Sequence, residues 1–200
     1  MDSHDLFVLR SIFTAGFRPR LVTTEFNTNY WGRPIAISQL DPTLATSSVP
    51  IGYKFVYQRC AWGASSYAFE LLAREFGYSL VALSVGHGSD LFFVRDDLLA
   101  PSVVKPTRSA FFRNAGLNMA RIPKRSADAD PLQIRSPPGS GHGSFLWHGP
   151  GFQRGENILE LMIDYETCQR TGDVSASVAA AAGTLRRNMS DSPCWQGLFS

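Results

Sequence analysis

The clearest pattern of apolar and polar positions lies in Gly63–Asp97 and predicts a helix, a strand, a tight turn and a second strand. After the serine pair 65–66, a candidate N-cap, apolar residues recur at helical spacing. Gly77 stands where a glycine cap ends a helix. Two apolar runs of strand length, 80–85 and 91–94, follow on either side of turn-forming residues. The pattern therefore predicts an α/β core element.

A second helical pattern opens the chain. Apolar residues recur on one face of residues 5–16, and Gly16 can close that helix. Its candidate N-terminal caps are Asp2, Ser3 and Asp5. Pro19 prevents continuation, and Arg20–Phe26 is rich in β-branched and aromatic residues, which predicts a strand. A helix followed by a strand is half of a βαβ unit.

The next segment has no sustained period. Residues 27–50 carry three prolines, which predicts a long loop with at most one short strand around 35–37. Residues 51–62 are aromatic-rich and are expected to be partly extended.

Composition changes after Leu99. Residues 100–150 form a Pro- and Gly-rich basic linker between a predicted α/β region, 1–99, and a helical extension, 151–200. Residues 105–125 hold six basic residues and no acid. A solvated, loosely structured surface is the favoured interpretation, and a contact surface for an acidic partner is the alternative.

Two helices are predicted in the extension. Residues 157–170 place Ile158, Leu161, Met162 and Tyr165 on one face. Residues 174–187 are alanine-rich, with Asp173 as a cap. Because alanine buries little area, this second helix needs a close-packing neighbour.

Composition excludes several classes of protein. A net charge of +2 argues against dedicated nucleic-acid binding, which needs a concentrated basic excess. Three widely spaced cysteines form neither a disulfide framework nor a zinc pattern. The chain is expected to be soluble, without a signal peptide or a membrane span, and its compartment stays open.

Motifs for common chemistry are absent from the sequence. The four histidines form no helical pair and join no cysteine pair, so no metal site is predicted. The sequence contains no Gly-x-Ser-x-Gly elbow, no Walker-type loop and no strand followed by Gly-x-Gly-x-x-Gly.

Acidic residues at strand ends are more informative. Glu25 lies at the carboxyl end of the strand 20–26 and is followed by Asn27. Ligands of parallel α/β sheets bind outside the carboxyl ends of strands, where Asp2 and Asp5 would also lie. Glu25 could equally make a surface hydrogen bond, and helix capping is the favoured role of Asp5.

These segments, in this order, resemble the C-terminal half of FkbM-type methyltransferases. Asp2–Asp5 is similar to the acidic step after the family's fourth strand, and Arg20–Asn27 to a fifth strand that ends in Glu-Tyr-Asn, with Phe26 in place of tyrosine. Gly63–Arg95 is similar to the Gly-Ala-Ser helix and the sixth and seventh strands. The resemblance covers residues 2–99.

The resemblance implies an α/β fold with part of a Rossmann-like methyltransferase sheet. It implies the strand order fourth, fifth, seventh, sixth, with the seventh antiparallel. It also implies S-adenosylmethionine as cofactor and a small-molecule or glycan-like hydroxyl acceptor. The acceptor cleft would be lined by Asp2, Glu25 and Asn27, with a carboxylate that orients the acceptor or takes its proton.

The family's cofactor loop and the acidic residue after its second strand have no counterpart in this sequence. The chain alone is therefore expected not to bind S-adenosylmethionine. Without a fourth strand, Arg20–Phe26 would be an exposed sheet edge, which favours pairing with a protein partner. The alternative to a methyltransferase is a non-catalytic interaction module that uses this edge and the basic segment 105–125.

Overall fold

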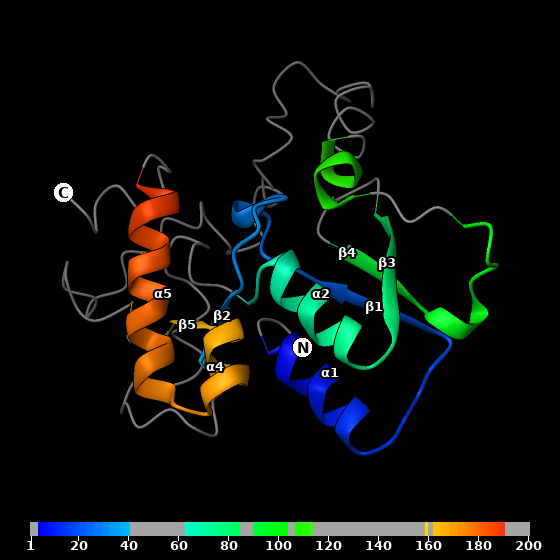
Figure 1. Cartoon of the computed structure of the whole chain (residues 1–200), viewed down its shortest axis with the longest axis horizontal. Helices are drawn as coiled ribbons and strands as arrows, with labels where there is room; N and C mark the ends of the chain where they lie inside the picture. The colour runs from blue at the N-terminus through cyan, green and yellow to red at the C-terminus, as the bar shows by residue number, and fades with distance from the viewer. Residues whose placement is uncertain are drawn as a thin grey trace, which may run out of the picture.

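The computed structural model describes residues 4–40, 63–84, 90–103, 107–113, 159 and 162–190. Within these residues the chain is a mixed α/β protein with two small antiparallel sheets (Figure 1). Its elements are α1 (Asp5–Thr14), β1 (Leu21–Glu25), the 3-10 turn η1 (Thr28–Tyr30), β2 (Ile37–Gln39), α2 (Ser66–Glu75), β3 (Tyr78–Leu83), β4 (Asp90–Arg95), the 3-10 turn η3 (Asp96–Leu98), β5 (Met162–Asp164), α4 (Tyr165–Thr171) and α5 (Val174–Met189).

The first sheet has the order β1-β4-β3, and β4 is antiparallel to both neighbours. The predicted strands are confirmed, with bounds shifted by one or two residues. The order agrees with the fifth, seventh and sixth strands that the resemblance implies. Within the described ranges no two neighbouring strands are parallel, so the sheet is not a parallel Rossmann sheet.

This sheet has one covered face and one open face. Val22 and Thr24 are buried, whereas the alternate residues Leu21, Thr23 and Glu25 are exposed. Their register partners on β4 follow the same division: Phe93 and Leu91 are buried on the covered face. Successive side chains of a strand point to opposite faces, so this alternation shows that only one face carries the core.

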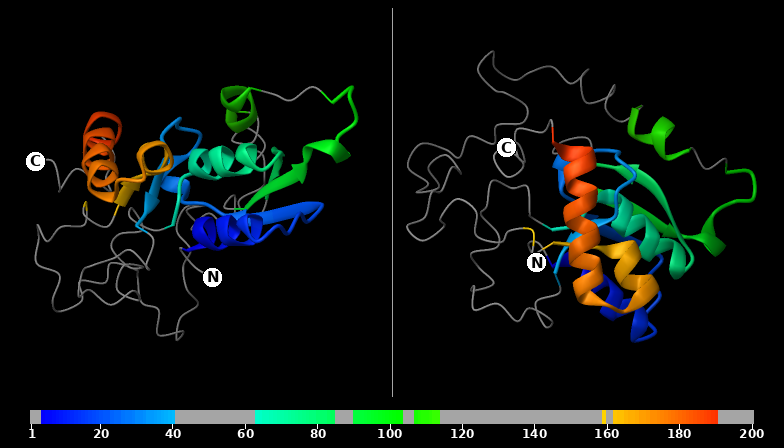
Figure 2. Two further views of the ribbon diagram at one scale, coloured as in Figure 1. Left: turned by 60° about the horizontal axis from the view of Figure 1, so that its bottom comes forward. Right: turned by 60° about the vertical axis from the view of Figure 1, so that its left-hand side comes forward.

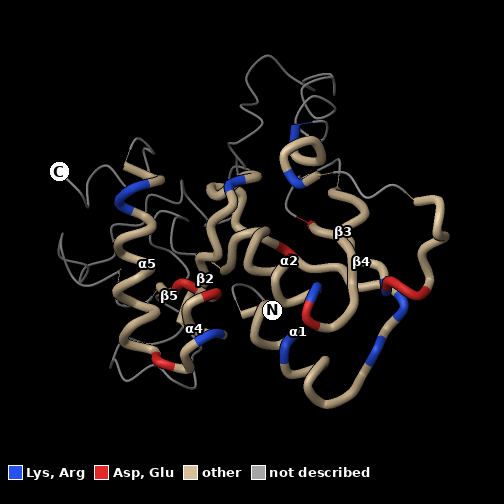
Figure 3. Tube along the Cα trace, viewed as in Figure 1, with Lys and Arg blue, Asp and Glu red and all other residues tan. Residues whose placement is uncertain are grey.

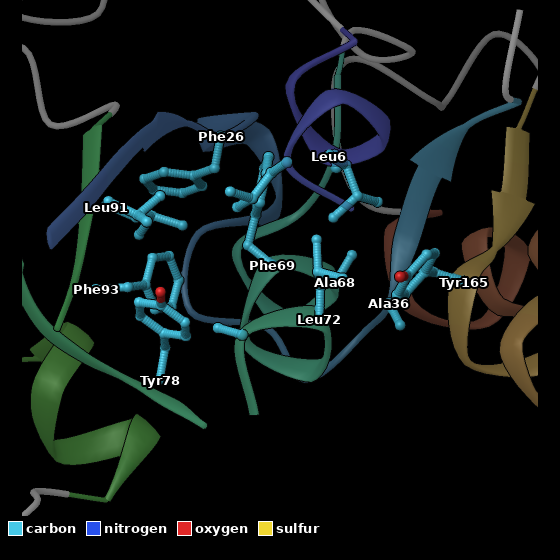
Figure 4. Packing of buried hydrophobic residues seen from close by; sticks show 14 of the residues in the cluster. Leu6, Phe26, Ala36, Ala68, Phe69, Leu72, Tyr78, Leu91, Phe93 and Tyr165 are labelled. Atoms are coloured by element: carbon cyan, nitrogen blue, oxygen red, sulfur yellow. The ribbon is translucent and has the colours of Figure 1, made fainter. Parts of the chain in front are cut away.

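Helices α1 and α2 supply the cover. Phe13 of α1 stacks on Tyr78 of β3 with ring centroids 4.8 Å apart, and its ring lies 5.0 Å from Phe76. Figure 4 shows Phe69 and Leu72 of α2 beside the buried side chains of the sheet. The core of this unit is therefore a helix–sheet interface built largely from aromatic residues.

The ends of α2 follow the sequence signals. Ser65 is the N-cap, and its Oγ accepts from the Ala68 backbone N–H at 3.2 Å. Gly77 follows the helix with φ of 78°, which confirms the predicted glycine cap. At α1 the capping prediction is wrong, because His4 is the N-cap and Asp5 is the first helical residue. The carboxylate of Asp5 still lies at the positive end of the helix dipole.

The second sheet pairs β2 with β5 and joins the predicted N-terminal and C-terminal regions. A short strand near 35–37 is confirmed as β2. The helix predicted over 157–170 is wrong at residues 162–164, which form β5, and α4 begins only at Tyr165. Met162 and Ile163 are both buried, so pairing with β2 outweighs the helical spacing of their apolar side chains. The Asp164 side chain then caps α4 by accepting from the Thr167 N–H at 2.9 Å.

Helix α5 packs on β5, as Figure 2 shows from two directions. Asp173 is its cap, as predicted, and accepts from the Ala176 N–H at 3.0 Å. Ala181 and Leu185 are fully buried, which supplies the close neighbour that the alanine-rich helix requires. The two C-terminal helices therefore pack against the second sheet. Within the described ranges, β1 has a strand neighbour on one side only, which is β4.

Residues 108–113 are helical. For these residues the interpretation of a solvated, loosely structured surface is wrong, because Phe112 is buried against Trp31 and Phe26. Gly32 is required beneath Phe112: its φ is 60°, and an added Cβ would lie 2.9 Å from the Phe112 Cβ. No described helix is long and apolar enough to cross a membrane.

Candidate functional site

The predicted acceptor site lies at the carboxyl end of β1. Of its three residues, Asp2 lies outside the described residues. Glu25 is exposed at the last position of β1, opposite Asp90 in the register with β4. Two acidic residues therefore lie opposite each other at one end of the sheet, at the end of β1 and the start of β4.

Asn27 lies two residues after Glu25 in the chain but is buried, with 1% of its surface exposed. Its Oδ1 accepts from the backbone N–H of Asn29 at 3.0 Å and from the Asn29 side chain at 2.9 Å. Its own N–H donates to the Ala64 carbonyl at 2.8 Å. Asn27 thus caps the turn η1 and ties the end of β1 to the start of α2. These contacts make Asn27 a positioning residue for this edge.

A second candidate site was not predicted from the sequence. It is a groove of about 410 Å³ that we name the α2–β3 groove. Its lining residues are Glu70, Arg74, Tyr78, Ser79, Leu80, Phe93, Asp96, Arg108 and Phe111. Aromatic and aliphatic side chains with a few charged groups among them are typical of small-molecule sites of this size.

Arg108 is the most constrained charged residue of this groove. Its guanidinium forms an ion pair with Glu70, and the two side chains are each only 15% exposed. The guanidinium carbon lies 4.6 Å from the centre of the Phe112 ring and 5.2 Å from that of Tyr67. The charge is therefore enclosed between two aromatic rings and one carboxylate.

Backbone and hydroxyl acceptors complete the environment of Arg108. Its Nε donates to the Gly32 carbonyl at 3.3 Å, and an Nη donates to the Arg33 carbonyl at 3.2 Å and to the Ser66 hydroxyl. One arginine thus joins the 30–33 turn, the first turn of α2 and the helical segment 108–113. Burial lowers the pKa of the Arg108 guanidinium to about 10, so it is still charged at neutral pH.

Local sequence signals for this arrangement exist but are weak. Thr107 caps the short helix by accepting from the Ala110 N–H at 3.3 Å, and Phe111 and Phe112 follow at once. A capping residue before two aromatic residues suggests a short packed helix. The contact between Arg108 and Glu70 joins residues far apart in the chain, and no local pattern encodes it.

Arg95 and Asp97 form another ion pair, at 2.5 Å, where β4 ends and η3 begins. Its hydrogen bond from Arg95 holds the pKa of the Asp97 carboxyl below its usual range. This pair lies at the surface, and in water such a pair stabilises little.

Among the residues that the structure describes, no group of three or more histidine, cysteine or carboxylate side chains is placed to hold a metal ion. Cys168 has a free thiol and is half-buried. Cys60 and Cys194 lie outside the described residues. The described part of the chain therefore offers two places of interest. One is the carboxylate edge, the end of the first sheet with Glu25 and Asp90, and the other is a groove with a buried ion pair.

The described residues thus form a mixed α/β protein whose main sheet is covered on one face, with candidate sites at the end of β1 and in the α2–β3 groove. No family model matches the chain, and comparisons with curated proteins and with solved structures also give no match.

Proposed function

We propose that residues 1–99 form the acceptor-side, closing part of an S-adenosylmethionine-dependent methyltransferase of the FkbM type. The observation that carries the proposal is the order β1-β4-β3, with β4 antiparallel to both neighbours. This order equals the one that the sequence resemblance implies for the fifth, seventh and sixth strands. The cover of one sheet face by α1 and α2 supports the same arrangement.

In this proposal Glu25 faces the hydroxyl acceptor. It is exposed at the carboxyl end of β1, where ligands of α/β sheets bind. A carboxylate within hydrogen-bond reach of a hydroxyl can orient it and accept its proton as the methyl group is transferred. Asn27 holds the strand end in place through Asn29 and Ala64. Asp2 would add a second carboxylate at this edge.

The test adds what the proposal requires, a cofactor-binding half. In a chimera, the N-terminal half of an FkbM-type enzyme, through its fourth strand, precedes the whole chain. Titration calorimetry is expected to show S-adenosylmethionine binding by the chimera and none by the chain alone. With a hydroxyl acceptor, Glu25→Gln is expected to reduce methyl transfer at least about 100-fold, the effect of losing a general base.

Hydrogen exchange supplies the control. The Arg95 N–H donates to the Arg20 carbonyl at 3.2 Å, so residues 22 and 24 share the hydrogen-bonded positions with β4, and the N–H groups of Leu21 and Thr23 point to the outer edge. In the chimera these two amides are expected to become protected by the fourth strand. A folded chimera in which they exchange as in the chain alone would contradict the proposed sheet.

A non-catalytic interaction module is the second candidate, because β1 is an edge strand among the described residues. Leu21 is 54% exposed and Phe17, just before β1, is 68% exposed. An edge strand beside exposed apolar side chains can pair with a strand of another chain.

Thr23→Pro tests this second candidate. Proline removes the outward N–H of Thr23 and leaves the bonds to β4 in place, so the fold is expected to persist while association at the edge is lost. Sedimentation velocity over a range of concentrations measures the association, and far-UV circular dichroism measures the fold. Thr24→Pro, which interrupts the β4 ladder, is expected to disrupt the sheet. Equal association of the parent chain and Thr23→Pro would exclude the outer edge of β1 as the surface of association.

A further inference from the structure

Side chains of α1, α2 and α4 line an open hollow at the surface. Its volume is about 420 Å³, and we name it the three-helix hollow. It is lined by Arg10 of α1, by Leu71, Arg74 and Glu75 of α2, and by Gln169 of α4. Because every lining residue stands on a helix, the positions are set by packed elements rather than by loops.

The two arginines of the hollow are both exposed, and Arg74 also lines the α2–β3 groove. In the described part of the chain, Arg18, Arg95 and Arg108 donate to carbonyl or carboxylate oxygens. The guanidinium groups of Arg10 and Arg74, like that of the exposed Arg170, form no hydrogen bond or ion pair with a described residue. Basic positions on α1 and at the end of α2 lie side by side in Figure 3. Two guanidinium groups from different helices therefore face one hollow with their donors available.

The remaining polar groups of the hollow are engaged with each other. The Gln169 amide donates to Glu75 Oε2 at 2.7 Å and to the Tyr165 hydroxyl at 3.2 Å. Glu75 is the single acid among the lining residues, so one net positive charge is left over. Burial raises the pKa of Tyr165 to about 12, and the charge of Arg10 acts against that shift. Arg10 thus also lies close to the wall that α4 forms.

We propose that the three-helix hollow binds a small oxyanion, the phosphate group of inorganic phosphate or of a phosphomonoester. Planar guanidinium groups bind phosphate through paired N–H donors, and arginine is preferred where such recognition is needed. Two arginines can together neutralise a doubly charged phosphate. Leu71 provides an apolar wall against which an organic substituent could lie.

Binding of this anion has a structural consequence. The anion would be held by α1 and α2 at the point where α4 contacts them through Gln169 and Glu75. It would therefore stabilise the attachment of α4 to the first helical layer, since a ligand that binds only the assembled form favours that form. Amides of α4 are expected to exchange more slowly when the anion is bound.

Titration calorimetry of the whole chain with inorganic phosphate, at constant ionic strength set by chloride, tests the site. Arg10→Gln and Arg74→Gln are each expected to weaken phosphate binding at least about tenfold, one lost charge-assisted contact. Arg170→Gln is the matched control, since Arg170 is an exposed arginine of α4 that does not line the hollow, and it is expected to change affinity less than about twofold. Equal losses in all three variants, or phosphate binding no tighter than chloride, would overturn the proposal.

Two probes separate the sources of the anion. Phenyl phosphate binding tighter than inorganic phosphate, with the difference removed by Leu71→Ser, supports a phosphomonoester. Equal affinities that still depend on Arg10 and Arg74 support free phosphate. Hydrogen exchange is read in the same samples, and α4 amides that show no added protection at saturating phosphate would overturn the proposed position of the anion.

Discussion

Replacement of Glu70 by leucine is expected to lower the free energy of unfolding by about 3–5 kcal/mol, because it leaves the Arg108 charge buried without its counter-charge. Both side chains of this ion pair are only 15% exposed, so water replaces the carboxylate poorly. The guanidinium is also fixed by the carbonyls of Gly32 and Arg33 and cannot leave without breaking those bonds. Urea denaturation measures the change as a lower midpoint at unchanged slope.

The double variant is the control for this prediction. Glu70→Leu combined with Arg108→Met replaces both charges by apolar groups, which often restores stability at a buried pair. The double variant is therefore expected to be more stable than Glu70→Leu alone. Asp97→Asn, in the exposed Arg95–Asp97 pair, is expected to leave the midpoint nearly unchanged. A Glu70→Leu variant as stable as Asp97→Asn would show that the charge of Arg108 finds water or another partner.

Tyr165→Ala is expected to cost about 3–5 kcal/mol, the range for truncation of a large buried aromatic side chain. Tyr165 is fully buried, although it is the first residue of α4. It lies in the core of the first unit, which is the β1-β4-β3 sheet with α1 and α2. The second unit consists of β2, β5, α4 and α5. Its backbone N–H donates to the Ala36 carbonyl at 2.7 Å. Figure 4 shows its ring beside Ala36, at the end of the core formed by α2. The ring therefore fastens the second unit to the first.

The location of the effect distinguishes this role from general destabilisation. In Tyr165→Ala, amides of α4 and α5 are expected to lose protection from hydrogen exchange before those of α2 and β4 do. Tyr165→Phe keeps the ring and loses only the hydroxyl that accepts from Gln169 at 3.2 Å, so a cost of about 1 kcal/mol or less is expected. Uniform loss of protection in Tyr165→Ala would mean that the two units unfold as one.

The candidate sites differ in how far the sequence predicts them. The carboxylate edge could be anticipated from the sequence, because Glu25 and Asn27 follow directly from where a strand ends. The α2–β3 groove and the three-helix hollow could not, since each joins side chains from segments far apart in the chain. Arg108 shows the difference: from its neighbours in sequence it belongs to a basic surface, and in the structure it is enclosed by Tyr67, Phe112 and Glu70.

The sequence by itself determined the elements whose stability is local. Ser65, Asp173 and Gly77 mark helix ends through hydrogen bonds or backbone conformations that span only a few residues, and the structure has them where the pattern predicts them. The β-branched residues along 20–26 likewise predicted a strand there, and β1 occupies residues 21–25.

Only the tertiary structure decided the rest. Met162 and Ile163 have helical spacing with their neighbours, yet pairing with β2 makes them a strand, because backbone hydrogen bonds and burial on both faces outweigh a weak local preference. The same reason applies to Arg108, whose burial depends on a carboxylate 38 positions earlier in the chain. Long-range partners, which no local pattern encodes, determined where a charged side chain such as Arg108 is buried.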